Sequence, residues 1–318
     1  MKGIDLSKDF YSEYGLPSVK EHFPNLVERI AFGLIGEGSE CFGFDDKLST
    51  DHDFEPGFCM WLTDEDYQEY GFKLERLYAK LPKEFNGYNR APLSPVGGNR
   101  HGVIKIGEFY SKFLGIPNAP TDDIEWFNIP HETLATATNG VVFKDDLGVF
   151  SSIREKLKQG YPQDVRLKKM CAHLVYMAQS GQYNYGRAVT RQDFGSAQLC
   201  LFEFVKNAIS MVYLINNVYE PFYKWVFKGM KNLSVLNSLE PLFLSLIEND
   251  NSQPNYEKKV ELIRQISSSI VEQLRNQGLL CEQNLCDTKT VDLESVAYTL
   301  QNKIRNANIR NMHIMEGI

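Results

Sequence analysis

Two patterns of apolar and polar positions divide the chain near residue 150. Before that point short apolar runs alternate with segments of helical spacing, and most of the Gly and Pro residues lie there. After it, apolar residues recur every three or four positions over long stretches, which is typical of helices that bury one face. The pattern predicts an α+β protein with two domains, one at 1–155 that combines strands and helices, and one at 156–318 that is helical.

The first domain is predicted to hold short buried strands separated by helices. The best-defined helix begins after Thr63, a suitable N-cap, and has three acidic residues in its first turn, where they favour the helix dipole. Because Pro, Gly and Asn are dense at 83–100, that stretch is predicted to be a loop or flap. The predicted strands are 30–35, 51–62, 102–106 and 141–143. The predicted helices are 17–28, 64–81, 107–114 and 129–139.

The second domain is predicted to contain helices and no strand. Its longest apolar segment is 194–217, and the segment that ends the chain, 303–318, alternates basic and apolar residues. Asparagines interrupt that alternation, which favours a solvated helix end or a homodimer contact over a helix on a membrane surface. The predicted helices are 151–158, 162–179, 194–217, 220–233, 238–248, 256–277 and 293–307.

Composition narrows the classes of function. The chain has 318 residues, 41 acidic against 34 basic side chains and a formal net charge of −7. This charge gives no global field for duplex nucleic acid, so we do not expect a nucleic-acid partner. Since no secretory signal and no uninterrupted apolar run of about 20 residues is present, we expect a soluble cytoplasmic protein without a membrane partner. The six scattered cysteines predict reduced thiols.

The most informative stretch is 36–53, GEGSECFGFDDKLSTDHD. A Gly38-Ser39 turn after a buried strand lets backbone N–H groups approach a phosphate, and the Ser39 hydroxyl adds a donor. Asp51 and Asp53 alternate on the next predicted strand, so both carboxylates project from one face. Such a pair beside a phosphate-binding turn suits a nucleoside triphosphate with bound Mg²⁺. Taken singly, each piece is also explained by a bend or a solvated turn; their order and spacing favour a site.

At these residues the sequence resembles the DNA polymerase beta-like nucleotidyltransferase superfamily, whose signature is an apolar strand, Gly-Ser, a spacer and Asp-x-Asp. More closely it resembles a bacterial branch of that superfamily, a domain family of unknown function with a nucleotidyltransferase half and a helical half. The resemblance covers about residues 30–230. Its matching pieces are Gly38-Ser39-Glu40, Ser49-Thr50-Asp51-His52-Asp53, Pro56-Gly57, Glu125-Trp126, Asn139-Gly140-Val141-Val142-Phe143, Asp145, Arg154, Tyr161-Pro162, Arg187, Arg191, Asp193, Tyr219, Pro221 and Lys224-Trp225.

This resemblance implies a mixed-sheet catalytic domain, similar to aminoglycoside and lincosamide adenylyltransferases, followed by a helical bundle on the substrate side. It implies that a substrate hydroxyl attacks the α-phosphorus of a nucleoside triphosphate and that pyrophosphate leaves. Asp51 and Asp53 would hold Mg²⁺, while Gly38, Ser39 and Ser49 would lie at the nucleotide. The implied partners are ATP or another nucleoside triphosphate and a small-molecule acceptor.

The sequence departs from the superfamily at the third carboxylate, which usually lies on a later strand and ligates metal or deprotonates the hydroxyl. The corresponding strand here, 102–106, contains no acid. Glu108, just past its end, is our substitute for the catalytic third carboxylate, with a solvated helix residue as the alternative. His101 has no evident partner in the sequence.

Cations of the second half are further nucleotide-binding candidates. Arg187 and Arg191 offer guanidinium donors suited to phosphate or carboxylate, although Arg191 could instead pair with Asp193. Lys224 could reach a phosphate or simply solvent. Asp145 is best explained as a helix cap or turn rather than a metal ligand.

The sequence thus predicts a Mg²⁺-dependent nucleotidyltransferase that transfers AMP from ATP to a hydroxyl of a small molecule. Two alternatives remain open. One is a non-catalytic nucleotide-binding or partner-binding protein on the same fold, which the missing third carboxylate favours. The other is nucleotidyl transfer to a protein or RNA target.

Overall fold

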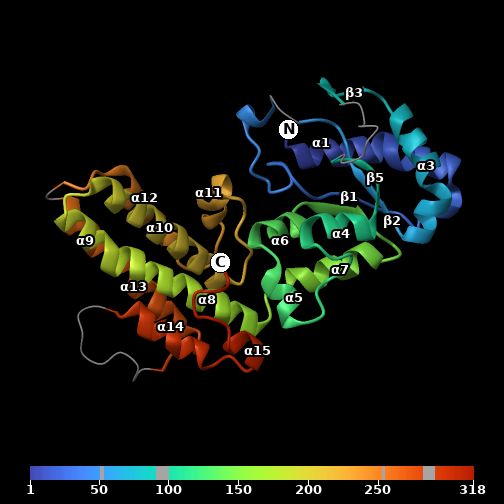
Figure 1. Ribbon diagram of the computed structural model, residues 1–318. Coiled ribbons are helices and arrows are strands. Elements are labelled where there is room, and N and C mark those ends of the chain that lie inside the picture. The colour runs from blue at the N-terminus through green and yellow to red at the C-terminus, as the bar shows by residue number, and fades with distance from the viewer. Residues whose placement is uncertain (51–53, 91–99, 253–254, 282–290) are drawn as a thin grey trace. The chain divides into compact units, whose positions relative to one another are not determined.

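The protein consists of two compact units, each continuous in space but not in sequence. The structure, a computed structural model, describes residues 1–50, 54–90, 100–252, 255–281 and 291–318 (Figure 1). Unit 1 comprises Met1–Pro120 and Ile129–Gln159, and unit 2 comprises Thr121–Asn128 and Gly160–Ile318. The chain therefore leaves unit 1 for eight residues, returns, and leaves it again after Gln159.

Unit 1 is built on a four-stranded mixed sheet with the strand order β5-β2-β1-β6. Its strands are β1 (Ala31–Leu34), β2 (Cys59–Leu62), β5 (Gly102–Lys105) and β6 (Val141–Lys144). β1 is antiparallel to both neighbours, β2 and β6, whereas β5 runs parallel to β2. The predicted α+β fold class is confirmed. The predicted strand 51–62 is shorter within the described residues, because regular pairing begins at Cys59 after the Pro56-Gly57 bend.

Every residue of β1 and β2 is buried, because helices cover both faces of this sheet. On one face Phe32, Met60 and Leu62 join a core with Leu6 and Phe10 of the first helix. Four helical segments contribute to this face, namely α1 (Gly3–Phe10), the π-helix η1 (Tyr11–Gly15), α2 (Leu16–His22) and α3 (Asp64–Lys80). The sequence analysis did not predict α1.

On the other face Trp61 is the central side chain. Its ring stacks on Phe150 at a centroid distance of 4.0 Å and meets the edge of Phe109 at 5.4 Å. The helices of unit 1 that supply and surround these rings are α4 (Ile106–Leu114), α6 (His131–Thr138) and α7 (Val149–Lys158). Asp145 accepts hydrogen bonds from the N–H groups of Gly148 and Ser151 at the start of α7, which confirms its capping role.

Local sequence signals explain the start of α3 and the turn of a short hairpin. The Thr63 hydroxyl accepts a hydrogen bond from the Asp66 N–H at the start of α3, as the N-cap prediction required. Part of the predicted 83–100 loop is instead a hairpin, formed by β3 (Glu84–Phe85) and β4 (Tyr88–Asn89). Its two turn residues, Asn86 and Gly87, have φ angles of +50° and +82°, the conformation that an Asn-Gly hairpin turn adopts.

The regular secondary structure of unit 2 is helical among its described residues. The long α8 (Gln163–Met177), α10 (Phe194–Asn216) and α13 (Asn255–Asn276) are joined in its core by α14 (Leu293–Gln301). The π-helix η4 (Ala178–Asn184) connects α8 to α9. The shorter elements are α5 (Asp123–Asn128), α9 (Tyr185–Thr190), the 3-10 turn η5 (Tyr223–Trp225), α11 (Val226–Met230), α12 (Glu240–Glu248) and α15 (Ala307–Arg310).

Two features of unit 2 bear on the predictions for its apolar segments. α10 is long and apolar enough to cross a membrane, yet 67% of its most apolar window is buried in the protein, as in the core helix of a soluble protein. The chain end packs within its own unit, since the buried Lys168 donates to the carbonyls of Met312 and His313, at 3.2 and 2.5 Å. The cytoplasmic location stays a prediction.

Candidate functional site

The candidate site begins at the turn that leaves β1. Gly36 and Gly38 have φ angles of +131° and +121°, a region that favours glycine over residues with a side chain. The Asn139 amide holds the turn from the side: its Oδ1 accepts from the Gly36 N–H at 3.0 Å and its Nδ2 donates to the Gly36 carbonyl at 2.7 Å. Next to it, the Gly140 N–H donates to the Cys41 carbonyl at 2.7 Å. The matching Asn139-Gly140 piece of the sequence therefore shapes this turn.

Strand pairing brings three segments to the same edge of the sheet. Because β1 and β2 are antiparallel with Gly33 opposite Cys59, the end of β1 lies beside the start of β2. β5 is parallel to β2 with Gly102 opposite Cys59, so Arg100 and His101 lie at this edge as well. The turn at 36–39, the chain entering β2 and the start of β5 therefore converge.

The two predicted metal ligands, Asp51 and Asp53, lie outside the described residues. The chain that follows them is fixed by contacts at the converging edge. The Ser7 hydroxyl donates to the Gly57 carbonyl at 2.5 Å, and His101 Nδ1 lies 2.9 Å from Glu55 Oε1. The metal-binding role of the two aspartates stays a prediction.

His101 and Glu55 form a largely buried pair. The His101 side chain is 6% exposed and that of Glu55 is 20% exposed. The imidazole packs against Gly57, where a Cβ would stand 2.7 Å from the ring. Gly57 therefore makes room for the His101 ring. The sequence analysis had left His101 without a partner.

The turn itself carries a second pair of charges. Arg100 Nη2 donates to the Glu37 carbonyl at 2.5 Å and forms an ion pair with Glu40. On the other side of the turn, Lys112 Nζ lies 2.8 Å from Glu37 Oε2. The sequence analysis named neither Arg100 nor Lys112, because only the strand order places them beside residues more than 60 positions away.

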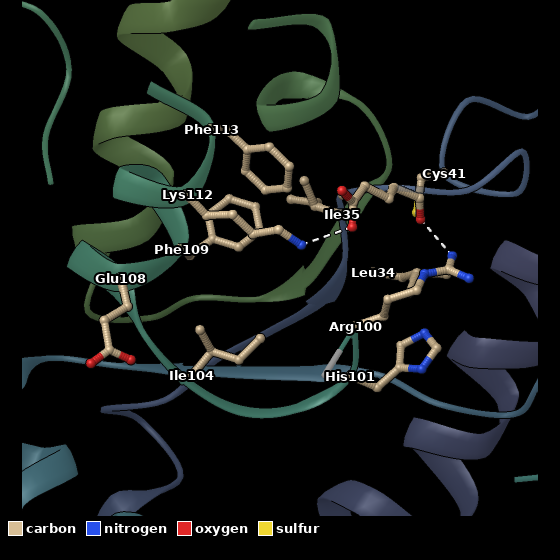
Figure 2. A pocket seen from close by; sticks show the side chains of 12 residues that line it. Leu34, Ile35, Cys41, Arg100, His101, Ile104, Glu108, Phe109, Lys112 and Phe113 are labelled. Carbon is tan, nitrogen blue, oxygen red and sulfur yellow. Dashed lines mark hydrogen bonds and ion pairs between the residues drawn. The ribbon is translucent and has the colours of Figure 1, made fainter. Parts of the chain in front are cut away.

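Glu37, Arg100 and Lys112 line a pocket of about 200 Å³ between the end of β1, β5 and α4. Figure 2 shows Arg100 and His101 at one end of it, Glu108 at the other, and Ile104 between them. Ile35, Phe109 and Phe113 provide apolar lining, and Cys41 adds a thiol whose pKa burial raises well above its usual value. The pocket therefore combines an apolar floor with charged groups next to the turn.

Glu108, the proposed third carboxylate, follows the C-terminal end of β5, whereas the turn lies beside the N-terminal end of that strand. It is in the first turn of α4, its side chain is 61% exposed, and it forms an ion pair with Lys105 at 2.9 Å. The structure thus brings Gly38 together with Arg100 but leaves Glu108 at the opposite side of the pocket. Its catalytic role is untested.

Ser49 lies in the short 3-10 turn η3 (Lys47–Thr50) that precedes the two aspartates in sequence. Its hydroxyl accepts from the Asp46 N–H at 3.1 Å and contacts Asp46 Oδ1 at 3.3 Å. This bonding organises the turn locally, and a contact between Ser49 and a nucleotide stays a prediction.

The remaining nucleotide-binding candidates belong to unit 2. Arg187 lies on α9 and Arg191 directly after it, both exposed, and neither has an ion-pair partner among the residues that the structure describes. Asp193 does not pair with Arg191; it accepts from the Ser196 N–H and caps α10. The Lys224 ammonium lies 5.2 Å from the centre of the Trp225 ring, a cation–π contact. No contact in unit 2 tests their role.

Metal-ligating side chains do not cluster in the described part of the chain. No group of three or more His, Cys, Asp or Glu residues suited to a metal ion occurs there. The nearby carboxylates are engaged otherwise: Glu40 by Arg100, Glu55 by His101, and Asp45 by the Gly3 N–H and Lys2.

Part of the chain matches the model of a known protein family. Residues 126–226 match a family described as a domain of unknown function, DUF4037. The matched range includes Asn139, Gly140, Arg187 and Lys224, but it begins after the turn at 36–39. No curated protein matches the sequence.

Proposed function

We propose that this protein is a Mg²⁺-dependent nucleotidyltransferase that transfers AMP from ATP to a hydroxyl group of a small molecule. One observation carries the proposal: the Gly36–Ser39 turn, with two glycines at positive φ, leaves a buried strand at the edge where the chain after Asp53 enters β2. This is the strand arrangement that a Gly-Ser turn and an Asp-x-Asp pair need in order to share one triphosphate.

The residues of the chain would act mainly by positioning. Backbone N–H groups of the turn and the Ser39 hydroxyl would bind the phosphates that leave, while Asp51 and Asp53 would hold Mg²⁺. When bound, the ion would neutralise the charge that develops on the phosphate oxygens. The oxygen of the acceptor hydroxyl forms a bond to the α-phosphorus as the bond to pyrophosphate breaks.

The donor set fits Mg²⁺ in kind. The ion prefers hard oxygen ligands and is usually held by one or two carboxylates together with phosphate and water oxygens. The described residues contain no soft or imidazole cluster that would favour zinc instead. Two aspartates and the triphosphate would therefore make up the set.

The acceptor's proton needs a base, for which Glu108 remains our candidate. Its pairing with Lys105 gives it a position at the pocket but also occupies its carboxylate. The described strand β5 contains no acid. This absence favours a second function, a non-catalytic nucleotide-binding protein on this fold. Transfer to a protein or RNA target remains the alternative to a small-molecule acceptor, and a homodimer and a cytoplasmic location are part of the proposal.

Calorimetric titration tests the proposal. ATP, GTP, CTP and UTP are titrated with and without Mg²⁺ into the wild type and into the Asp51→Asn, Asp53→Asn double variant. We expect Mg²⁺-dependent binding that the double variant loses while its circular dichroism spectrum is unchanged. Retained Mg²⁺-dependent binding in the double variant would rule out the metal assignment, and absence of binding to any nucleotide in the wild type would refute the proposal.

A further inference from the structure

The proposed phosphate-binding turn carries negative charge of its own. Glu37 and Glu40 flank Gly38 and Ser39, and carboxylates at this position oppose the approach of a polyphosphate. Each carboxylate is paired with a cation, Glu40 with Arg100 and Glu37 with Lys112. The two cations come from the start of β5 and from α4, so the charges of the turn are balanced from the side of the pocket.

The Arg100–Glu40 pair lies directly against the turn. A Cβ on Gly38 would collide with Arg100 Nη2 and with both carboxylate oxygens of Glu40. The side chain of Glu40 is 10% exposed and that of Arg100 is 23% exposed. An anion and a guanidinium group therefore already occupy the space beside Gly38.

We propose that Arg100 binds the polyphosphate of the nucleotide, and that Glu40 holds its guanidinium group until phosphate oxygens replace the carboxylate. The guanidinium fork matches the geometry of carboxylate and phosphate alike, so the exchange leaves Arg100 paired throughout. The inference rests on the proposed function for its ligand, a nucleoside triphosphate. It adds Arg100 to the nucleotide-binding candidates of unit 1 and assigns Glu40 as an internal competitor for its guanidinium group.

The proposal predicts opposite effects for the two members of one ion pair. Arg100→Gln removes a charge-assisted contact to phosphate, which should weaken binding by about tenfold or more. Glu40→Gln removes the carboxylate that competes with phosphate for the guanidinium group and should tighten binding by about three- to tenfold. A pair that only supports the turn would give changes in the same direction.

The experiment is calorimetric titration of ATP with Mg²⁺, and of inorganic tripolyphosphate without metal, at one ionic strength. The variants are Arg100→Gln, Glu40→Gln and the double variant. Arg264→Gln is the matched control, since Arg264 forms an exposed ion pair with Glu261 in unit 2. Thermal melting of each variant checks that the fold is retained.

We expect Glu40→Gln to tighten the binding of both probes only while Arg100 is present, so that the double variant binds like Arg100→Gln. Weaker binding in both single variants, or unchanged binding in Arg100→Gln, would overturn the inference, as would the absence of tripolyphosphate and ATP binding in the wild type. Mg²⁺-dependent ATP binding that needs the two aspartates but not Arg100 would leave the proposed function standing without this inference. Arg100-dependent tripolyphosphate binding without Mg²⁺-dependent ATP binding would support Arg100 as a polyphosphate-binding residue but refute the proposed function.

Discussion

The two hydrogen bonds between the Asn139 amide and Gly36 give a quantitative test of how the turn is held. Asn139→Ala deletes both hydrogen bonds to the Gly36 peptide groups, which have lengths of 3.0 and 2.7 Å. Each bond contributes on the order of 1 kcal/mol net, and the loss rises when a buried backbone group stays unpaired. Gly36 is buried. We therefore expect the variant to lose about 3 kcal/mol of the free energy of unfolding of unit 1.

The assay is urea unfolding followed by the fluorescence of Trp61. This residue is fully buried in the sheet of unit 1, and replacing Trp126 and Trp225 with Phe in both proteins removes the signal of unit 2. With a urea dependence of about 2–3 kcal/mol per molar, the midpoint should fall by about 1 M. An unchanged slope would show that the extent of unfolding is the same.

Thr138→Ala, at the last residue of α6 next to Asn139, is the matched control. Its hydroxyl donates to the Leu134 carbonyl at 2.7 Å, a bond within its own helix, so the variant should lose less than about 1 kcal/mol. A loss under about 0.5 kcal/mol in Asn139→Ala, or equal losses in both variants, would refute the reasoning that the amide holds the turn.

Three further predictions concern other parts of the chain. Gly140→Ala should lower the melting temperature, because its φ is +62° and a Cβ would collide with the Leu34 carbonyl; an unchanged melting curve by calorimetry would contradict this. In native protein at pH 8, iodoacetamide should modify the exposed Cys281 well before Cys59, whose pKa burial raises to about 12, as mass spectrometry of labelled peptides can measure. Hydrogen bonds lower the pKa of Asp250 to about 2, so its contribution to the free energy of unfolding is present above the unfolded pKa near 3.8 and is lost as the pH falls towards 2. Asp250→Asn should therefore flatten the pH dependence of stability between these values. Identical curves of stability against pH for the two proteins would argue against the lowered pKa.

Elements with a strong local pattern could be predicted from the sequence. α3 has an N-cap and a first turn of acids, and the strands β1, β5 and β6 have apolar runs that end at polar or glycine positions. The Asn86-Gly87 turn was also a local signal, yet the density of Pro and Gly around it favoured a loop. The first helix, α1, was missed although it buries Leu6 and Phe10.

The contacts of the candidate site could not be predicted, because they depend on which strands are neighbours. Asn139 lies 103 residues from Gly36, and Arg100 lies 60 residues from Glu40. No periodicity or spacing reports such pairs, whereas the order β5-β2-β1-β6 places them together at once. The Gly38-Ser39 turn was found because its residues are adjacent in the sequence.

The excursion of the chain into unit 2 has a consequence for synthesis on the ribosome. The excursion, residues 121–128, contains α5, where the largely buried Trp126 meets the edge of Tyr161 and Asn306 donates to Asp123 at 2.7 Å. At about 5–20 residues per second, α5 emerges seconds before α8 and much longer before Asn306. In the nascent chain, residues 129–159 of unit 1 therefore emerge before the partners of Trp126 and Asp123 do. A fragment cut at residue 159 would keep that indole exposed permanently, so expression of unit 1 by itself should be planned without α5.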